Sequence, residues 1–159
     1  MIRDIGQDTQ KEYLSRLGLF NSVNIDIPEK AVPIVPEPWR MVNTESISYG
    51  YGLSISPLHL AIATSSVING GYLINPTLIK TSSETIHIEK VFSDHTSEVM
   101  RYLLNKVVDE GTARDAFGKN ADRAYTIDEK FKYIVGGKTG TARKINNKTY
   151  VNEKMTSFI

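Results

Sequence analysis

One short stretch constrains this chain more than any other: Gly136-Gly137-Lys138-Thr139-Gly140-Thr141. The residues that lead into it are rich in aromatic and β-branched types, which predicts a strand over Phe131-Lys132-Tyr133-Ile134-Val135. Because side chains alternate along a strand, Thr139 and Thr141 share one face and Lys138 lies on the other. A glycine inside a strand, here Gly140, often marks the close approach of a ligand or another backbone. Two hydroxyls, a cation and a strand edge suit a substrate that carries a carboxylate and an amide.

Three interpretations of this stretch are open at this point. The plainest is a glycine-loosened strand with a surface lysine. The second is a phosphate-binding P-loop, which needs a glycine five positions before its Gly-Lys pair; Lys132 occupies that position, so we reject it. The third is the Lys-Thr-Gly element of penicillin-binding proteins and serine β-lactamases, which accompanies a Ser-x-x-Lys nucleophile motif and a Ser-x-Asn-like motif. The rest of the chain has to decide.

Composition limits the function classes. The 159 residues are enough for one domain with a sizeable core, and a net charge of +1 gives no reason to expect a nucleic-acid partner. The absence of cysteine excludes disulfides and thiolate chemistry. The three histidines show no metal-ligand spacing, so we expect no metal and no cofactor, and His59 is interpreted as a packing or surface residue. No apolar run approaches the length of a membrane span, and Met1-Ile2-Arg3-Asp4 opens no signal peptide.

Helical periodicity predicts three helices. Thr9-x-x-Glu12 has the spacing of a capping box, and residues 9–17 follow as a short helix. Ser56-Pro57 is a strong start for a helix over residues 57–69, which Asn69-Gly70-Gly71 ends. Ser93 or Asp94 caps a third helix that ends at Gly111, and residues 112–117 add one more turn.

The remaining segments are predicted as extended or irregular. Four prolines make residues 24–40 an extended surface connection. Residues 72–80 and 85–91 are short extended pieces, and residues 118–130 are polar and loop-like. Asn146-Asn147 marks a turn after which residues 150–159 return antiparallel to the Lys-Thr-Gly strand.

Four segments, in order, resemble class B penicillin-binding proteins, the monofunctional peptidoglycan transpeptidases. They are Tyr49-Gly50-Tyr51-Gly52-Leu53, Ser56-Pro57-Leu58-His59-Leu60-Ala61 with Asn69-Gly70-Gly71, Glu110-Gly111-Thr112-Ala113, and Gly137-Lys138-Thr139-Gly140-Thr141-Ala142. The first of them resembles the division-associated branch. The resemblance implies an α+β fold like that of the penicillin-binding proteins and serine β-lactamases, with a five-stranded antiparallel sheet between helices. Residues 1–159 would form an incomplete transpeptidase domain that supplies the third and fourth strands.

Two of the three active-site motifs are not in this sequence. No serine has a lysine three positions on, so there is no Ser-x-x-Lys nucleophile. Ser22-Val23-Asn24 matches Ser-x-Asn formally, but its surroundings resemble a surface segment downstream of the true motif, and we do not take it as catalytic. We therefore expect the back part of a transpeptidase domain, without its front and its last strand. Thr156-Ser157-Phe158-Ile159 are expected to start a buried strand that is cut off.

The resemblance implies acyl transfer in the intact domain. A serine attacks the D-alanyl-D-alanine carbonyl of a peptidoglycan stem, a neighbouring stem takes the acyl group, and β-lactams mimic the first substrate. Lys138 and Thr141 would be catalytic, Lys138 through proton transfer and the Thr141 backbone N–H as an oxyanion-hole donor. Thr139, Gly140 and Thr141 would bind the substrate, with the two hydroxyls on its terminal carboxylate.

Without the nucleophile, the chain alone is expected to be inert. Its expected partners are a peptide stem or β-lactam, the missing N-terminal half, and divisome proteins. Intact family members are expected at the periplasmic face of the bacterial inner membrane, whereas a chain without its own signal or anchor is expected in the cytoplasm. The alternative hypothesis is a non-catalytic protein that keeps a peptide-binding strand or docks onto another wall-synthesis protein.

Overall fold

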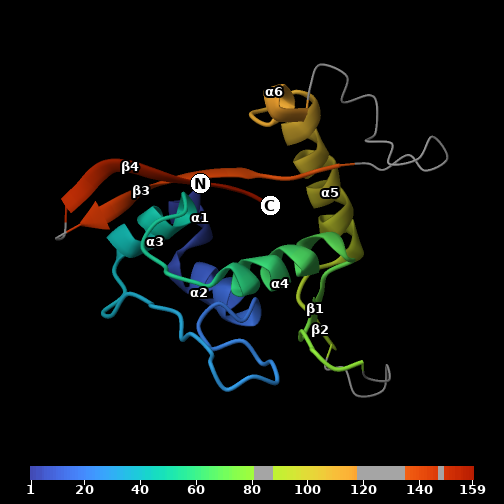
Figure 1. The fold of residues 1–159 in the computed structure, drawn as a ribbon, viewed down its shortest axis with the longest axis horizontal. Helices are drawn as coiled ribbons and strands as arrows, with labels where there is room; N and C mark the ends of the chain where they lie inside the picture. Colours follow the sequence, from blue (N-terminus) through green and yellow to red (C-terminus); the bar gives the residue numbers. More distant parts are fainter. Residues whose placement is uncertain (81–87, 118–134, 147–148) are drawn as a thin grey trace. The chain divides into compact units, whose positions relative to one another are not determined.

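The computed structural model describes residues 1–80, 88–117, 135–146 and 149–159. The chain divides into two compact units, Met1–Ser97 and Glu98–Ile159, and the division falls inside helix α5 (Asp94–Asp109). Each unit combines helices with a two-stranded antiparallel sheet (Figure 1). The expected α+β class, and its incomplete sheet, are confirmed.

The first unit holds most of the helices. Its elements are α1 (Ile2–Ile5), α2 (Gln7–Arg16), α3 (Met41–Ser48), α4 (Pro57–Ile68), β1 (Tyr72–Ile74), β2 (Ile88–Lys90) and the first turn of α5. The second unit holds the rest of α5, then α6 (Arg114–Phe117), β3 (Thr139–Asn146) and β4 (Thr149–Phe158). The Lys-Thr-Gly stretch and its returning strand therefore lie together in the second unit.

Helix α4 begins where the sequence predicts, at Ser56-Pro57. The Ser56 hydroxyl accepts a hydrogen bond from the His59 backbone N–H at 3.3 Å and lies 2.7 Å from His59 Nδ1. His59 Nε2 lies 2.9 Å from the Asn21 carbonyl, which can only accept, so the ring proton sits on Nε2. The His59 side chain is only 3% exposed. His59 is thus a packing residue that ties the start of α4 to the segment after α2.

The short sheet of the first unit packs against the end of α4 through Gly71. Its φ is +93°, and a Cβ at this position would overlap the Phe92 carbonyl. The Gly71 carbonyl accepts a hydrogen bond from Val91 N at 2.7 Å. Phe92 also contacts helix α2, since the Tyr13 ring stacks on the Phe92 ring with 6.0 Å between centroids. Only glycine fits at position 71, so the Asn-Gly-Gly end of α4 also sets where β1 and β2 lie.

Helix α3 was not predicted, because its apolar residues do not repeat at helical spacing. It is held by polar contacts instead. The Arg40 N–H donates to Asn43 Oδ1 at 2.7 Å in the first turn. The Trp39 indole N–H donates to Thr44 Oγ1 at 2.8 Å, and the Gln10 amide donates to the Thr44 carbonyl at 3.1 Å. Thr44 is fully buried, so a hydroxyl takes the central place that an apolar side chain usually has.

Three local predictions need correction. Helix α2 begins at Gln7 after Gly6, whose φ of +87° turns the chain out of α1, so Thr9 does not cap it. Val135, the last residue of the predicted strand over residues 131–135, is not in a strand, because β3 begins at Thr139. Residues 131–134 lie outside the described part of the chain, as do residues 81–87 and 118–130. Residues 156–159 start no new strand; β4 runs unbroken to Phe158, and most of it is exposed.

Other predictions are confirmed. Residues 24–40 contain no helix, and an isolated β-bridge joins Ile34 to Ser54. Helix α5 begins at Asp94, with the Ser93 hydroxyl accepting from Thr96 N at 3.1 Å. The antiparallel return after the Lys-Thr-Gly strand is β4.

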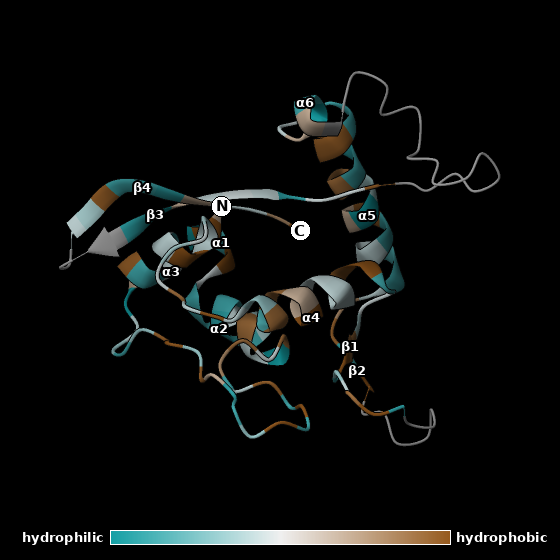
Figure 2. Ribbon diagram, in the orientation of Figure 1, coloured by the Kyte–Doolittle hydropathy of each residue, from teal (hydrophilic) through white to brown (hydrophobic). Residues whose placement is uncertain are grey.

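The described residues bury few large apolar side chains. Helix α4 carries hydrophobic residues along its length (Figure 2), yet Leu58, Leu60 and Ile68 are 37%, 39% and 41% exposed. On α5, Leu103 is 49% exposed. Within the described residues, no helix is both long and apolar enough to cross a membrane.

We expect Ser56→Ala to lower the free energy of unfolding by about 1 kcal/mol, because it removes the cap of α4 and the hydroxyl beside His59. Urea unfolding followed by circular dichroism measures this. Ser54→Ala is the matched control, since the exposed Ser54 bonds Ile34 through its backbone alone. Equal stability of the two variants would contradict the role of the cap.

Candidate functional site

The candidate site is built on the β3–β4 ladder of the second unit. Thr139 lies opposite Phe158, Gly140 opposite Ser157 and Thr141 opposite Thr156. Residues opposite one another share a face of the sheet. The hydroxyls of Thr139 and Thr141 therefore belong to the face that also carries Phe158.

The ladder decides which backbone groups remain available. Just before β3, Lys138 and Ile159 exchange both backbone hydrogen bonds, at 2.8 and 3.2 Å. Antiparallel pairs alternate between bonded and non-bonded positions, so Gly140 with Ser157 is the next bonded pair. The backbone groups of Thr139 and Thr141 consequently point away from β4. In the described part of the chain β3 pairs with β4 alone, and this edge of β3 faces no other strand.

The segment before β3 is anchored to helix α5. Gly137 N donates to the Leu104 carbonyl at 3.1 Å, and the Asn105 side-chain amide donates to the Val135 carbonyl at 2.9 Å. These bonds explain why residues 135–137 are not strand: their backbone groups bond the helix instead of a neighbouring strand.

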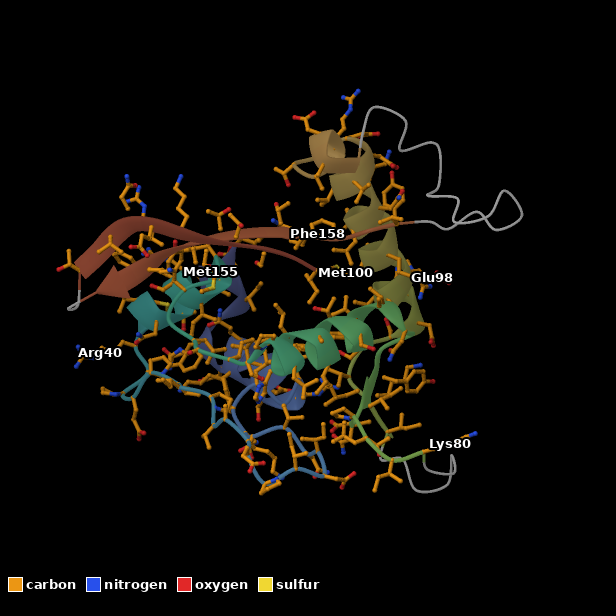
Figure 3. The ribbon with its side chains drawn as sticks, in the orientation of Figure 1. Arg40, Lys80, Glu98, Met100, Met155 and Phe158 are labelled. Carbon is orange, nitrogen blue, oxygen red and sulfur yellow. The ribbon has the colours of Figure 1, made fainter. Side chains whose placement is uncertain are left out.

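Gly137 is the buried glycine of the site. A Cβ there would overlap the Phe158 ring and come within 2.5 Å of the Ile159 carbonyl. Phe158 is labelled at this end of β4 in Figure 3. At Gly140 a Cβ would meet only the Ser157 hydroxyl, at 2.5 Å. The close approach expected at Gly140 is therefore a side chain, whereas the tight backbone approach occurs at Gly137.

Lys138 is exposed, and its ammonium donates to the Thr139 carbonyl at 2.8 Å. That carbonyl is one of the groups on the edge of β3 away from β4. The cation thus lies at the same edge as the Thr141 N–H. The three predicted side chains are brought to one end of one strand, within a single unit.

A hydrogen bond between two threonine hydroxyls joins this end of β3 to the turn after α5. Thr112 Oγ1 lies 2.8 Å from Thr139 Oγ1, and either can donate. The turn itself is fixed: Ala113 is 2% exposed and its N–H donates to the Val107 carbonyl at 3.1 Å. Thr112 belongs to the Glu110-Gly111-Thr112-Ala113 segment of the family resemblance, which by itself predicts no role for it.

An exposed ion pair sits beside this turn. The hydrogen bond from Lys106, followed by its charge, lowers the pKa of Glu110, and Glu110 in turn raises the pKa of Lys106. Because the pKa of Glu110 is lower in the folded state, the pair stabilises the turn at pH values above the unfolded-state pKa of Glu110. This stabilisation is lost as the pH falls through the folded-state pKa of Glu110. Both groups are solvated, so the effect is small.

The described residues contain no group of three or more metal-ligating side chains. The donors gathered at β3 are hydroxyls, one ammonium and backbone N–H groups, all of which suit an anion better than a cation.

Comparisons with known proteins decide the family. The family described as "Penicillin binding protein transpeptidase domain" matches residues 1–159. The chain belongs to the penicillin-binding protein transpeptidase family. The resemblance inferred from its four segments is confirmed.

Two relatives and one solved structure illustrate the match. Stage V sporulation protein D of Bacillus subtilis is 32% identical over 98% of this chain and 24% of its own length. "Probable peptidoglycan D,D-transpeptidase FtsI" of Caulobacter vibrioides is 33% identical over 88% of this chain and 22% of its own length. The transpeptidase domain of Burkholderia pseudomallei penicillin-binding protein 3 is 28% identical, with a TM-score of 0.78 over 95% of this chain and 44% of that one. This penicillin-binding protein chain thus spans about a quarter of the relatives' length.

Three residues shape this site of the penicillin-binding protein fold through roles that the sequence did not predict: Gly137, Asn105 and Phe158. Gly137 carries a sequence signal, since it is one of two consecutive glycines before the strand. Asn105 and Phe158 carry none, because their roles depend on contacts across the unit.

We expect Gly137→Ala to destabilise the second unit by about 1–3 kcal/mol, because the added methyl must displace Phe158 and the Ile159 backbone. Gly140→Ala should cost less, since the Ser157 hydroxyl can rotate. Hydrogen exchange at the Lys138 and Ile159 amides measures the difference. Equal exchange in both variants would show that the two glycines are equivalent.

Proposed function

We propose that this chain supplies the Lys-Thr-Gly side of a peptidoglycan D,D-transpeptidase active site, within a partial transpeptidase domain that spans residues 1–159. The observation that carries the proposal is the arrangement at one end of β3. Two hydroxyls share a face, while the Lys138 ammonium and the Thr141 N–H share the edge away from β4. This set matches a substrate with a terminal carboxylate and a reacting amide.

The hydroxyls of Thr139 and Thr141 bind the terminal carboxylate of a D-alanyl-D-alanine stem, or the equivalent carboxylate of a β-lactam. Hydrogen bonds to a charged group are stronger than neutral ones, at about 1.5–3 kcal/mol each. Gly140 lies between the two threonines in the strand, and a glycine at this position allows a ligand to approach the backbone closely. The substrate backbone then lies along the edge of β3, where no strand of the described residues pairs.

The same edge serves the chemistry. The Thr141 N–H is one oxyanion-hole donor for the tetrahedral intermediate, and loss of such a donor typically costs about a hundredfold to a thousandfold in rate. Lys138 gives up its bond to the Thr139 carbonyl and assists proton transfer near the nucleophile. The nucleophilic serine is outside this sequence, in which no serine has a lysine three positions on.

The chain alone is therefore inert, because covalent catalysis needs that serine. Its partner in the active state is the remainder of a transpeptidase domain. The resemblance of residues 49–53 to the division-associated branch supports a division-type role at the periplasmic face of the membrane for the assembled enzyme, and the activity named for the Caulobacter relative, peptidoglycan D,D-transpeptidase, supports the reaction. Divisome proteins are then further partners.

A second function stays in competition: a non-catalytic protein that binds peptides along β3 or docks onto a wall-synthesis protein. The open edge of β3 and the exposed side chains of β4 favour it, since an unpaired strand edge is a ready partner for an extended peptide.

We expect no covalent labelling by a fluorescent penicillin when the chain is tested alone, because reversible carboxylate binding does not survive denaturing electrophoresis. Co-production with the serine-bearing part of a division-type transpeptidase domain should restore labelling, with the label on the other polypeptide. Mass spectrometry of the acylated peptide locates it. Stoichiometric acylation of a serine of this chain, Ser22 included, would overturn the proposal.

Lys138→Ala should slow this labelling by roughly a hundredfold or more, as expected for loss of a proton-transfer group. Lys144→Ala is the matched control, because Lys144 is an exposed lysine of the same strand that pairs with Glu153 at 3.0 Å. Equal rates for the two variants would favour the non-catalytic alternative.

A further inference from the structure

We propose that Thr112 is a positioning residue for the carboxylate-binding hydroxyl of Thr139; this inference rests on the proposed function. The observation is the hydrogen bond of 2.8 Å between Thr112 Oγ1 and Thr139 Oγ1. The two residues are 27 positions apart, and no strand ladder requires their contact.

The direction of this hydrogen bond decides what Thr139 can do. A hydroxyl has one proton to donate and two lone pairs with which to accept. If Thr139 donates to Thr112, its proton is not available to a ligand, and its lone pairs repel an anion. If Thr112 donates, the Thr139 proton is free to point at the carboxylate. Binding of an anion therefore selects the second arrangement, in which both hydroxyls donate in the same direction.

Hydroxyls in such a chain strengthen one another, because each bond polarises the next. Thr112 thus has two effects on a bound carboxylate. It fixes the Thr139 side chain in one orientation, and it makes the Thr139 proton a better donor. Neither effect requires Thr112 to touch the ligand.

The turn that carries Thr112 is held firmly enough for this role. Gly111 sits against the backbone of Val107, where a Cβ would lie 2.8 Å from the Val107 Cα. Ala113 is buried, and Arg114 N donates to the Gly111 carbonyl at 3.2 Å. The Thr112 side chain is exposed, so its hydroxyl can be removed without opening a cavity.

The test measures the acylation rate constant in the assembled protein described above, with a penicillin and with its carboxyl methyl ester. We expect Thr112→Val to slow acylation by the free acid roughly two- to tenfold, the size of one net hydrogen bond. The ester, which presents no anion, should react at the unchanged rate. Thr112→Ser, which keeps the hydroxyl, should restore the wild-type rate with the free acid.

A double-mutant cycle with Thr139→Val checks that Thr112 acts through Thr139. In that background Thr112→Val should have no further effect. Thr112→Ala replaces Thr112→Val if the valine variant does not assemble.

The possible results separate the two proposals. If the wild-type assembly is acylated and Thr112→Val behaves like wild type, the positioning role is overturned and the proposed function stands. If Thr112→Val slows the free acid and the ester alike and serine does not rescue it, Thr112 is a structural tie only. If the wild-type assembly is not acylated at all, the proposed function fails and the positioning role fails with it.

Discussion

The candidate site depends on the exchange of two backbone hydrogen bonds between Lys138 and Ile159, next to Gly137, where a Cβ would overlap the Phe158 ring. This contact fixes the phase of the β3–β4 ladder. The phase in turn decides that the backbone groups of Thr139 and Thr141 point away from β4, while the alternation along β3 places their side chains on one face. The side chains supply the chemistry, but the pairing with the far end of β4 places them.

The anchoring of the Lys-Thr-Gly segment also explains how much the sequence could predict. The order of hydroxyl, glycine and hydroxyl was enough to predict a strand with both threonines on one face, because a period of two is local information, whereas the family resemblance needed four segments together. Helix α4 could also be predicted from the sequence, since Ser56-Pro57 is a local signal for the start of a helix. The start of β3 was not, because residues 135–137 bond to helix α5 rather than to a strand. Contacts of that kind join residues about thirty positions apart and leave no periodic pattern.

Helix α3 is a second element that the sequence pattern could not predict. Its centre is the buried Thr44, whose hydroxyl accepts a hydrogen bond from Trp39 and whose backbone carbonyl accepts one from Gln10 of helix α2. A hydrogen-bonded threonine satisfies burial as well as a leucine would, but it carries no hydrophobic signal. The large apolar side chains that do carry such a signal, on α4 and α5, are partly exposed in the described residues. In this chain hydrophobic periodicity therefore finds helices without finding the core.

The irregularity between Arg143 and Ile145 has a consequence for how this hairpin tolerates change. In an uninterrupted ladder, a one-residue insertion near the turn would shift every pair and carry Thr139 and Thr141 to the opposite face. Between these two pairs β3 has one residue and β4 has three, so the irregularity accommodates two extra residues of β4 locally. It divides the ladder into the pairs from Thr139 to Arg143, which contain the site, and the pairs from Ile145 onward. The end of β3 beside Lys138 therefore takes its register from Ile159, and not from the pairs beyond the irregularity.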